Sequence, residues 1–169
     1  VIRCDAGPEL FGSECVDSDL DPILKFDPDG NVVESFGGGM FIWPHGIDVD
    51  SDGNVWVTDA VSDNNIPAGD DRGHHVIKFS STGDVLMTLG TPGEQGNGPN
   101  NFTSPSDVAI ASNGDVFIAD GHNANGNNRV VKYDSRGEFL MSWGETGYAP
   151  GEFRALHAIA IDPDGRVFV

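Results

Sequence analysis

The sequence predicts an all-β protein of the β-propeller class, and three observations lead to this prediction. A unit of strand, tight turn and strand occurs three times, in residues 43–59, 106–121 and 157–169. The equivalent positions His45, Ser106 and His157 of the copies lie 61 and then 51 residues apart, a spacing typical of propeller and solenoid repeats. No segment of ten or more residues has the 3.6-residue hydrophobic period of a helix, so we expect almost no helix.

A second hairpin pattern alternates with the first, in residues 23–37, 76–90 and 130–144. Each copy begins with a four-residue strand such as Val76-Ile-Lys-Phe79, passes through a turn that ends in Gly, and returns in a strand that also ends in Gly. Short alternating runs bounded by Gly, Pro and Asp are typical of β-hairpins. One copy of each hairpin gives four antiparallel strands per period, which is the composition of a propeller blade.

We therefore interpret residues 1–169 as a single β-propeller domain or a fragment of one. Residues 1–20 form an irregular N-terminal segment, and residues 21–169 hold about three blades. A closed propeller needs about four to eight blades. The chain is thus expected to be part of a larger ring or, if it is complete, to close the ring as a homo-oligomer with a second copy.

The charge of the chain excludes one class of partner. The sequence has 9 basic and 27 acidic residues, a net charge of −18. Such a surface repels phosphate backbones, so we expect no binding to nucleic acid. No stretch approaches the roughly 18 apolar residues of a membrane helix, so we expect no membrane partner either. The expected ligand is a peptide or small molecule in the central channel.

The two cysteines, Cys4 and Cys15, both lie in the N-terminal segment. The loop between them is short and rich in Gly, Pro, Asp and Ser, which makes a bridge feasible. A cysteine pair alone does not identify a compartment. We favour a disulfide, and a disulfide implies a secreted or periplasmic protein.

His45 and His157 occupy the same repeat position, with Ser106 at that position in the copy between them. Equivalent positions of a radial repeat face the same central channel, so the two imidazoles are expected to converge. Neutral imidazoles around an open coordination position make a catalytic type of zinc site. The alternative is that each histidine only caps a strand or bonds a loop carbonyl.

Two other patterns suggest metal sites but have simpler interpretations. The run Asp48-Ile-Asp50-Ser-Asp52-Gly53 imitates a calcium loop of the EF-hand type, yet the repeats align it with hairpin turns. His74-His75 follows a loop that carries several aspartates. We expect these two histidines on a solvated edge, with a surface metal site as the alternative.

The order of the motifs resembles the NHL repeat and, among NHL proteins, the peptidyl-α-hydroxyglycine α-amidating lyases and their bacterial relatives. The matching pieces cover most of residues 20–169: Phe41-Ile-Trp-Pro-His-Gly-Ile47, Asn54-Val-Trp-Val-Thr-Asp59, Ser104-Pro-Ser-Asp-Val108, Asp115-Val-Phe-Ile-Ala-Asp-Gly121, Trp143-Gly-Glu145 and Pro150-Gly-Glu-Phe153, which runs into His157. The resemblance implies about half of a six-bladed propeller.

The same resemblance implies a function and two metals. Lyases of this family cleave a C-terminal α-hydroxyglycine to a peptide amide and glyoxylate. Their axial zinc is held by three histidines, of which the first falls on His45, the second on His157, and the third in a blade beyond this sequence. A structural calcium takes the backbone carbonyl that falls on Ile47, and its carboxylate ligand would lie beyond Val169.

Two further positions carry implied catalytic roles. Arg3 follows Val1-Ile2 where the lyases place an arginine that contacts the substrate and its developing charge. His122 stands where the lyases have a catalytic tyrosine. The two cysteines of a family disulfide fall on Thr103 and Asn123, so this sequence lacks that bridge. Imidazole can accept a proton near neutral pH, so His122 is the expected proton acceptor; its alternative role is to join the metal site.

Three functions remain open from the sequence. The first is a metal-dependent lyase similar to the amidating lyases. The second is a non-catalytic NHL propeller that binds a protein or small ligand. The third, a calcium-dependent lactonase, needs a carboxylate-rich centre, whereas the inner positions here offer histidine and serine.

Overall fold

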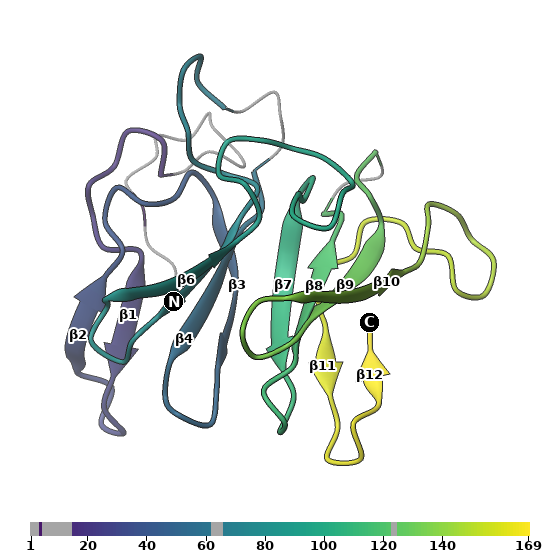
Figure 1. The fold of residues 1–169 in the computed structure, drawn as a ribbon. Coiled ribbons are helices and arrows are strands. Elements are labelled where there is room, and N and C mark those ends of the chain that lie inside the picture. Colours follow the sequence, from purple (N-terminus) through teal and green to yellow (C-terminus); the bar gives the residue numbers. More distant parts are fainter. Residues whose placement is uncertain (1–3, 5–14, 62–65, 123–124) are drawn as a thin grey trace.

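A computed structural model describes residues 4, 15–61, 66–122 and 125–169. These residues form strands and turns without a helix (Figure 1). The strands are β1 (Ile23–Phe26), β2 (Val32–Phe36), β3 (Pro44–Val49), β4 (Val55–Asp59), β5 (Val76–Phe79), β6 (Val85–Leu89), β7 (Pro105–Ile110), β8 (Val116–Asp120), β9 (Arg129–Tyr133), β10 (Phe139–Trp143), β11 (Ala160–Ile161) and β12 (Val167–Phe168). None of the described segments is a helix that could cross a membrane.

The strands form four antiparallel sheets that follow one another in chain order (Figure 1). Two sheets have four strands each, in the orders β3-β4-β5-β6 and β7-β8-β9-β10. They are flanked by the two-stranded sheets β1-β2 and β11-β12. The first strands of the two complete sheets, β3 and β7, contact each other, and β7 also contacts β11. The architecture is therefore that of a partial propeller, and the prediction of all-β four-stranded blades is confirmed.

Alternation along each strand explains how neighbouring sheets share cores. Successive side chains of a strand point to opposite faces of its sheet. In β4, Trp56 packs into a cluster with β7–β9, whereas the next residue, Val57, packs into a cluster with β1 and β2. In β8, Ile118 joins the cluster toward β4 and Phe117 the cluster toward β11 and β12. Both faces of the inner strands β4 and β8 are thus buried, whereas the outer strands β6 and β10 are largely exposed.

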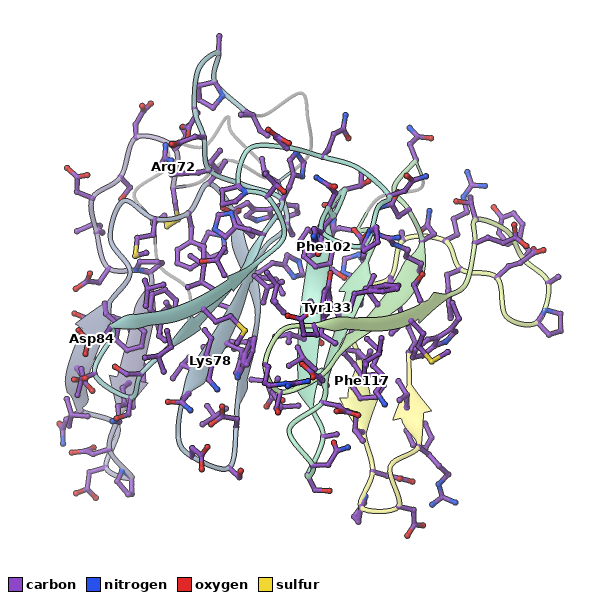
Figure 2. All side chains as sticks on the ribbon, in the orientation of Figure 1. Arg72, Lys78, Asp84, Phe102, Phe117 and Tyr133 are labelled. Atoms are coloured by element: carbon purple, nitrogen blue, oxygen red, sulfur yellow. A yellow bond between two sulfur atoms is a disulfide. The ribbon has the colours of Figure 1, made fainter. Side chains whose placement is uncertain are left out.

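The cluster between the two complete sheets is partly aromatic. Phe102 and Tyr133 are almost fully buried, with ring centroids 6.2 Å apart (Figure 2). The Tyr133 hydroxyl donates to the carbonyl of Pro99 at 2.6 Å, so its polar end is satisfied at the edge of the core. Burial raises the pKa of Tyr133 above its usual value, as expected for a phenol removed from water.

The calcium-loop imitation is a hairpin turn, as predicted. The Gly53 N–H donates to the carbonyl of Asp50, and Gly53 adopts a φ of 83°, which glycine reaches without steric cost. The Asp50 carboxylate accepts the backbone N–H groups of Asp52 and Asn54. The Asp50 side chain therefore closes the turn between β3 and β4.

The prediction that His74 and His75 lie on a solvated edge is wrong. His74 is 1% exposed and His75 is 2% exposed. The His75 ring stacks on Phe41, and its Nδ1 pairs with the carbonyl of Gly73 at 2.9 Å. The chain turns inward here because Gly73 has a φ of 88° and packs against Val61. The segment before β5 is consequently part of the core.

Candidate metal centre

Three imidazoles meet where three consecutive sheets approach one another. His45 lies in β3, His122 follows β8, and His157 precedes β11. One potential ligand nitrogen from each ring lies within 4.8 Å of the other two. The ring centroids are 4.6 Å apart for His45 and His122, 4.2 Å for His122 and His157, and 5.9 Å for His45 and His157. The sequence prediction that His45 and His157 converge agrees with this geometry, and His122 lies between them.

His45 is held by the neighbouring blade. Its Nδ1 lies 2.8 Å from the carbonyl oxygen of Ser106. A carbonyl oxygen only accepts hydrogen bonds, so Nδ1 carries the proton and donates it. The lone pair of the neutral ring is then on Nε2, the nitrogen available to a metal. This backbone partner fixes the tautomer and the ring orientation, as is usual for metal-ligating histidines.

A buried hydroxyl supports the same contact. Thr58 Oγ1 accepts the N–H of Gly46 at 2.8 Å and donates to the Ser106 carbonyl at 3.3 Å. Gly46 itself has no room for a side chain, because a Cβ there would lie 2.5 Å from Asp107 Cα and 2.6 Å from the Ser106 oxygen. The Pro-His-Gly sequence is therefore suited to the close approach of β3 and β7.

Buried carboxylates fix the segments that lead into these strands. Asp59, at the end of β4, accepts the N–H groups of Ile42 at 2.9 Å and Trp43 at 2.7 Å. Asp120, at the end of β8, accepts those of Thr103 and Ser104 in the same way. Burial raises the pKa of Asp59, while His75 and these N–H groups favour its charged form. The repeated aspartate thus positions the residues just before His45.

The backbone of His122 is fixed by Ser104 and Asn128. The N–H groups of Gly121 and His122 both donate to the carbonyl of Ser104 at 3.0 Å. Gly121 has a φ of 146°, and a Cβ there would lie 2.5 Å from the backbone nitrogen of Asn128. Asn128 Oδ1 in turn accepts the N–H of Ala155 at 2.8 Å, two residues before His157. His122 and the approach to His157 therefore share one support.

Trp43 packs against two of the three imidazoles. Its ring centroid lies 5.1 Å from that of His45 and 4.6 Å from that of His122, both nearly perpendicular. Burial, followed by the neighbouring His45 and His157, lowers the pKa of His122 to about 4. His122 is consequently neutral at pH 7, the state in which an imidazole can bind a metal.

The residues present fit a divalent metal that prefers nitrogen ligands. Within the described residues, the structure brings together three histidines with mutually close nitrogens, and for His45 the free nitrogen is defined. Two nitrogens on one tetrahedral zinc lie about 3.3 Å apart, given Zn–N bonds of about 2.0–2.1 Å. Small side-chain adjustments would bring ligand atoms that lie within 4.8 Å to that spacing. The cluster could therefore hold a metal.

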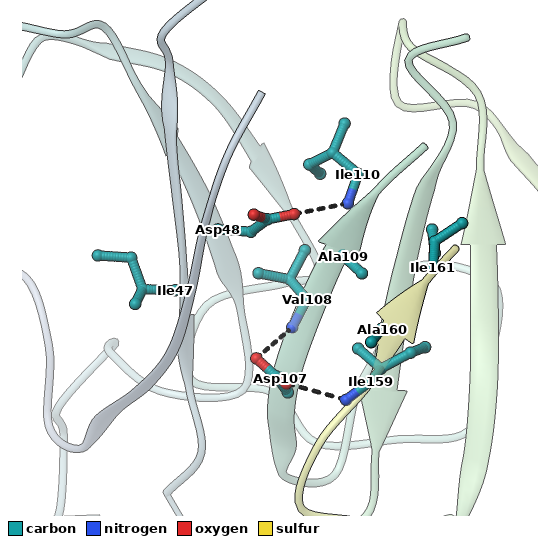
Figure 3. Close-up of a pocket in the computed structure, with 9 residues that line it drawn as sticks. All are labelled: Ile47, Asp48, Asp107, Val108, Ala109, Ile110, Ile159, Ala160 and Ile161. Carbon is teal, nitrogen blue, oxygen red and sulfur yellow. Dashed lines mark hydrogen bonds between the residues drawn. The ribbon is translucent and has the colours of Figure 1, made fainter. Parts of the chain in front are cut away.

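A cavity of about 340 Å³ lies along the inner strands (Figure 3). Its wall includes Ile47, which is 45% exposed and is the predicted calcium ligand. Asp48 accepts the N–H of Ile110 at 2.8 Å, and Asp107 accepts that of Ile159 at 2.9 Å. Each carboxylate thus joins its strand to the next blade, as the dashed lines in Figure 3 show.

The remaining predicted site residues have different outcomes. Arg3 lies outside the described residues. Ser106, between the two predicted metal ligands in the repeat, turns its hydroxyl to the carbonyl of Ala119 at 3.1 Å. Trp43 and Asp107 were not singled out by the sequence analysis. The signal for Asp107 was present, since a carboxylate there replaces the glycine of the Pro-His-Gly copy.

The predicted bridge between Cys4 and Cys15 is present. Cys15 is 3% exposed, and its N–H donates to the carbonyl of Ile42 at 2.9 Å. The bridge therefore ties the N-terminal segment to the residues that precede β3.

Comparison with known proteins identifies the repeat. The family model "NHL repeat" matches residues 41–66 and 102–133. The mouse (Mus musculus) peptidyl-glycine alpha-amidating monooxygenase is 35% identical over 85% of this chain, and peptidyl-alpha-hydroxyglycine alpha-amidating lyase 1 of Drosophila melanogaster is 34% identical over 84%. Human (Homo sapiens) NHL repeat-containing protein 3 is equally similar, at 35% over 87%. The chain spans 14%, 26% and 41% of these three relatives.

A solved structure supports the architecture alone. The structure titled "Streptogramin B lyase structure" aligns with 92% of this chain and 41% of its own, with a TM-score of 0.57 and 16% identity. The alignment places the described sheets in a partial propeller. At this identity the likeness is one of fold.

Proposed function

We propose that this chain, an NHL-repeat propeller segment related to the peptidyl-α-hydroxyglycine α-amidating lyases, forms part of a zinc-dependent carbon–nitrogen lyase. The observation that carries the proposal is the convergence of His45, His122 and His157, with ligand nitrogens within 4.8 Å of one another. A related lyase from Drosophila melanogaster, 34% identical, supports the choice of reaction.

In the proposed reaction, the C–N bond of a C-terminal α-hydroxyglycine breaks. The hydroxyl loses its proton and becomes the aldehyde of glyoxylate, and the departing nitrogen takes a proton to become the peptide amide. Zinc bound at the cluster would supply Lewis acidity that lowers the pKa of the substrate hydroxyl. His45 is prepared for its role by donating Nδ1–H to Ser106, which leaves Nε2 for the metal. Arg3 is proposed to bind the negative charge of the substrate.

A calcium ion at the carbonyl of Ile47 is a separate, structural part of the proposal. Ile47 lines the cavity beside Asp48, and the cavity borders three inner-strand segments. An oxygen-ligated cation there would suit the preference of calcium for carbonyl and carboxylate ligands. A substitution in the lining of this cavity that removes bound calcium but leaves zinc bound would show that the two metals occupy separate sites.

A non-catalytic propeller that binds a protein or small ligand is the second candidate. NHL repeat-containing protein 3 is as similar to this chain as the lyase relatives are. In addition, a histidine stands at the position of the lyases' catalytic tyrosine. A propeller of this kind would use the same channel without needing zinc.

We also place the protein outside the cytoplasm, in a secreted or periplasmic location. The bridge between Cys4 and Cys15 supports this, because disulfides persist in oxidising compartments. Thiol labelling of the protein taken from its native compartment, before and after reduction, tests the placement. Free thiols before reduction would contradict it.

Elemental analysis of the full natural protein tests the function first. Wild type is expected to carry about one zinc per propeller, and His45→Ala and His157→Ala are expected to lose it. The zinc-loaded protein should then release glyoxylate from an α-hydroxyglycine peptide. Zinc with no glyoxylate release would favour the binding propeller, and a protein without zinc would contradict the lyase.

A further inference from the structure

The middle position of the histidine cluster is occupied by His122. Its ring lies 4.6 Å from that of His45 and 4.2 Å from that of His157, whereas the outer two rings are 5.9 Å apart. A metal bound by the outer pair must therefore lie beside the middle ring. The ligand nitrogen of His122 is also within 4.8 Å of those of the other two histidines.

We propose that His122 is the third metal ligand supplied by this chain, and not a proton acceptor. The inference rests on the proposed metal site, and it assigns to His122 a role different from that of the tyrosine in the amidating lyases. His45, His122 and His157 would then form a three-imidazole site on three consecutive sheets, so that this chain supplies three of the four ligands of a tetrahedral metal.

The surroundings of His122 suit a ligand more than a mobile base. Both N–H groups at Gly121 and His122 are bonded to one carbonyl, that of Ser104. Gly121 is packed so closely on Asn128 that the backbone at this point has little freedom. On the other side, the Trp43 ring lies 4.6 Å away and nearly perpendicular. The imidazole is thus held near the other two rings by its backbone and by an aromatic neighbour.

The two roles of His122 exclude each other chemically. A neutral imidazole has one nitrogen with a lone pair and one that carries a proton. When the lone pair binds a metal, the remaining nitrogen can only donate a hydrogen bond. A ligating His122 therefore cannot take the hydroxyl proton of a substrate, and the acceptor must be another group or solvent.

Metal affinity separates these roles without an activity assay. The full natural protein is stripped of metal and titrated with Zn²⁺ in competition with a coloured chelator, for wild type and for His122→Phe, His122→Tyr, His45→Phe and His157→Phe. Partner residues of ligands change metal affinity by about 10–100-fold. Loss of a ligand should have a larger effect, so we expect at least a 100-fold weakening in all four variants.

Retention of wild-type affinity by both His122 variants, with loss in the His45 and His157 variants, would overturn the inference and leave the proposed zinc site intact. No zinc binding by wild type would instead contradict the proposed function itself.

A second measurement does not depend on variants that fold. In wild type loaded with ¹¹³Cd and labelled with ¹⁵N-histidine, one-bond couplings should appear at three chain histidines including His122; couplings that omit His122 would contradict its assignment.

Discussion

His45 donates its Nδ1–H to the carbonyl oxygen of Ser106 at 2.8 Å, and the two residues occupy the same repeat position in neighbouring blades. One copy of the repeat thus orients the candidate metal-ligating side chain of the copy before it. Thr58 donates to the same oxygen from β4 through a buried hydrogen bond, so this carbonyl is held by two side chains. Coupling between the blades therefore contributes to the geometry of the site as well as to the stability of the fold.

Replacing Gly46 by alanine should destabilise the contact between β3 and β7. The new Cβ would meet Asp107 Cα at 2.5 Å and the Ser106 oxygen at 2.6 Å, which are backbone atoms with little freedom to move. Overpacking of this kind costs about 1–3 kcal/mol, measurable by urea unfolding. Gly98→Ala is the control, since its nearest neighbour would be the Asn101 side chain at 3.3 Å. Equal effects of the two substitutions would contradict the argument.

Removing one partner of the buried ion pair between Arg129 and Asp120 should strongly destabilise the fold. Arg129 Nε donates to Asp120 at 3.0 Å, and its other nitrogens donate to the carbonyls of Asn97, Gly98 and Asn101. Arg129→Met leaves the fully buried Asp120 carboxylate without this partner, at a cost of about 3–5 kcal/mol. Chemical denaturation measures the loss. The exposed Arg136→Met should leave the unfolding midpoint nearly unchanged; a similar shift in both would sink the idea.

Acid stability should depend in part on Asp50. Burial by itself raises the pKa of Asp50, but hydrogen bonds from Asn54, Lys78 and Trp56 outweigh it and hold the pKa well below its usual value. Because the folded pKa is lowered, this stabilisation is fully present above the unfolded pKa of about 3.9 and is lost as the pH falls through the folded pKa.

Asp50→Asn should therefore lose stability relative to wild type at pH 7 and show a shallower dependence on pH below about 4. Urea unfolding at pH 7 and pH 3 provides the comparison. Asp52→Asn, at an exposed side chain in the same turn, is the matched control. Parallel pH curves for wild type and Asp50→Asn would show that the carboxylate is not responsible.

Trp43 should report metal binding. Its ring lies 5.1 Å from His45 and 4.6 Å from His122, so a paramagnetic Co²⁺ at the cluster would lie close to the indole and quench its emission. Trp43→Phe should abolish most of the quenching seen on Co²⁺ titration. Trp143→Phe, in the outer strand β10, should retain it. Quenching that survives in Trp43→Phe would indicate that cobalt binds elsewhere.

The sequence determined most of the fold because the information is local and repeated. Alternating strands, turns such as Asp50 to Gly53 and the copies of the repeat all act over a few residues, and each copy supports the others. The same repetition predicted that His45 and His157 would approach each other. The Cys4–Cys15 bridge was accessible from the sequence for the same reason, since its loop is short.

Only the tertiary structure decided what surrounds those residues. The burial of His74 and His75 depends on the close packing of Gly73 on Val61 and on the stacking of His75 on Phe41, contacts between segments that are separated along the chain. The position of His122 between two other imidazoles depends on the contacts of Ser104 and Asn128, and the tautomer of His45 depends on a carbonyl in the next blade. The repeat pattern determines which direction a side chain takes from its strand, whereas contacts between blades determine which atoms it meets.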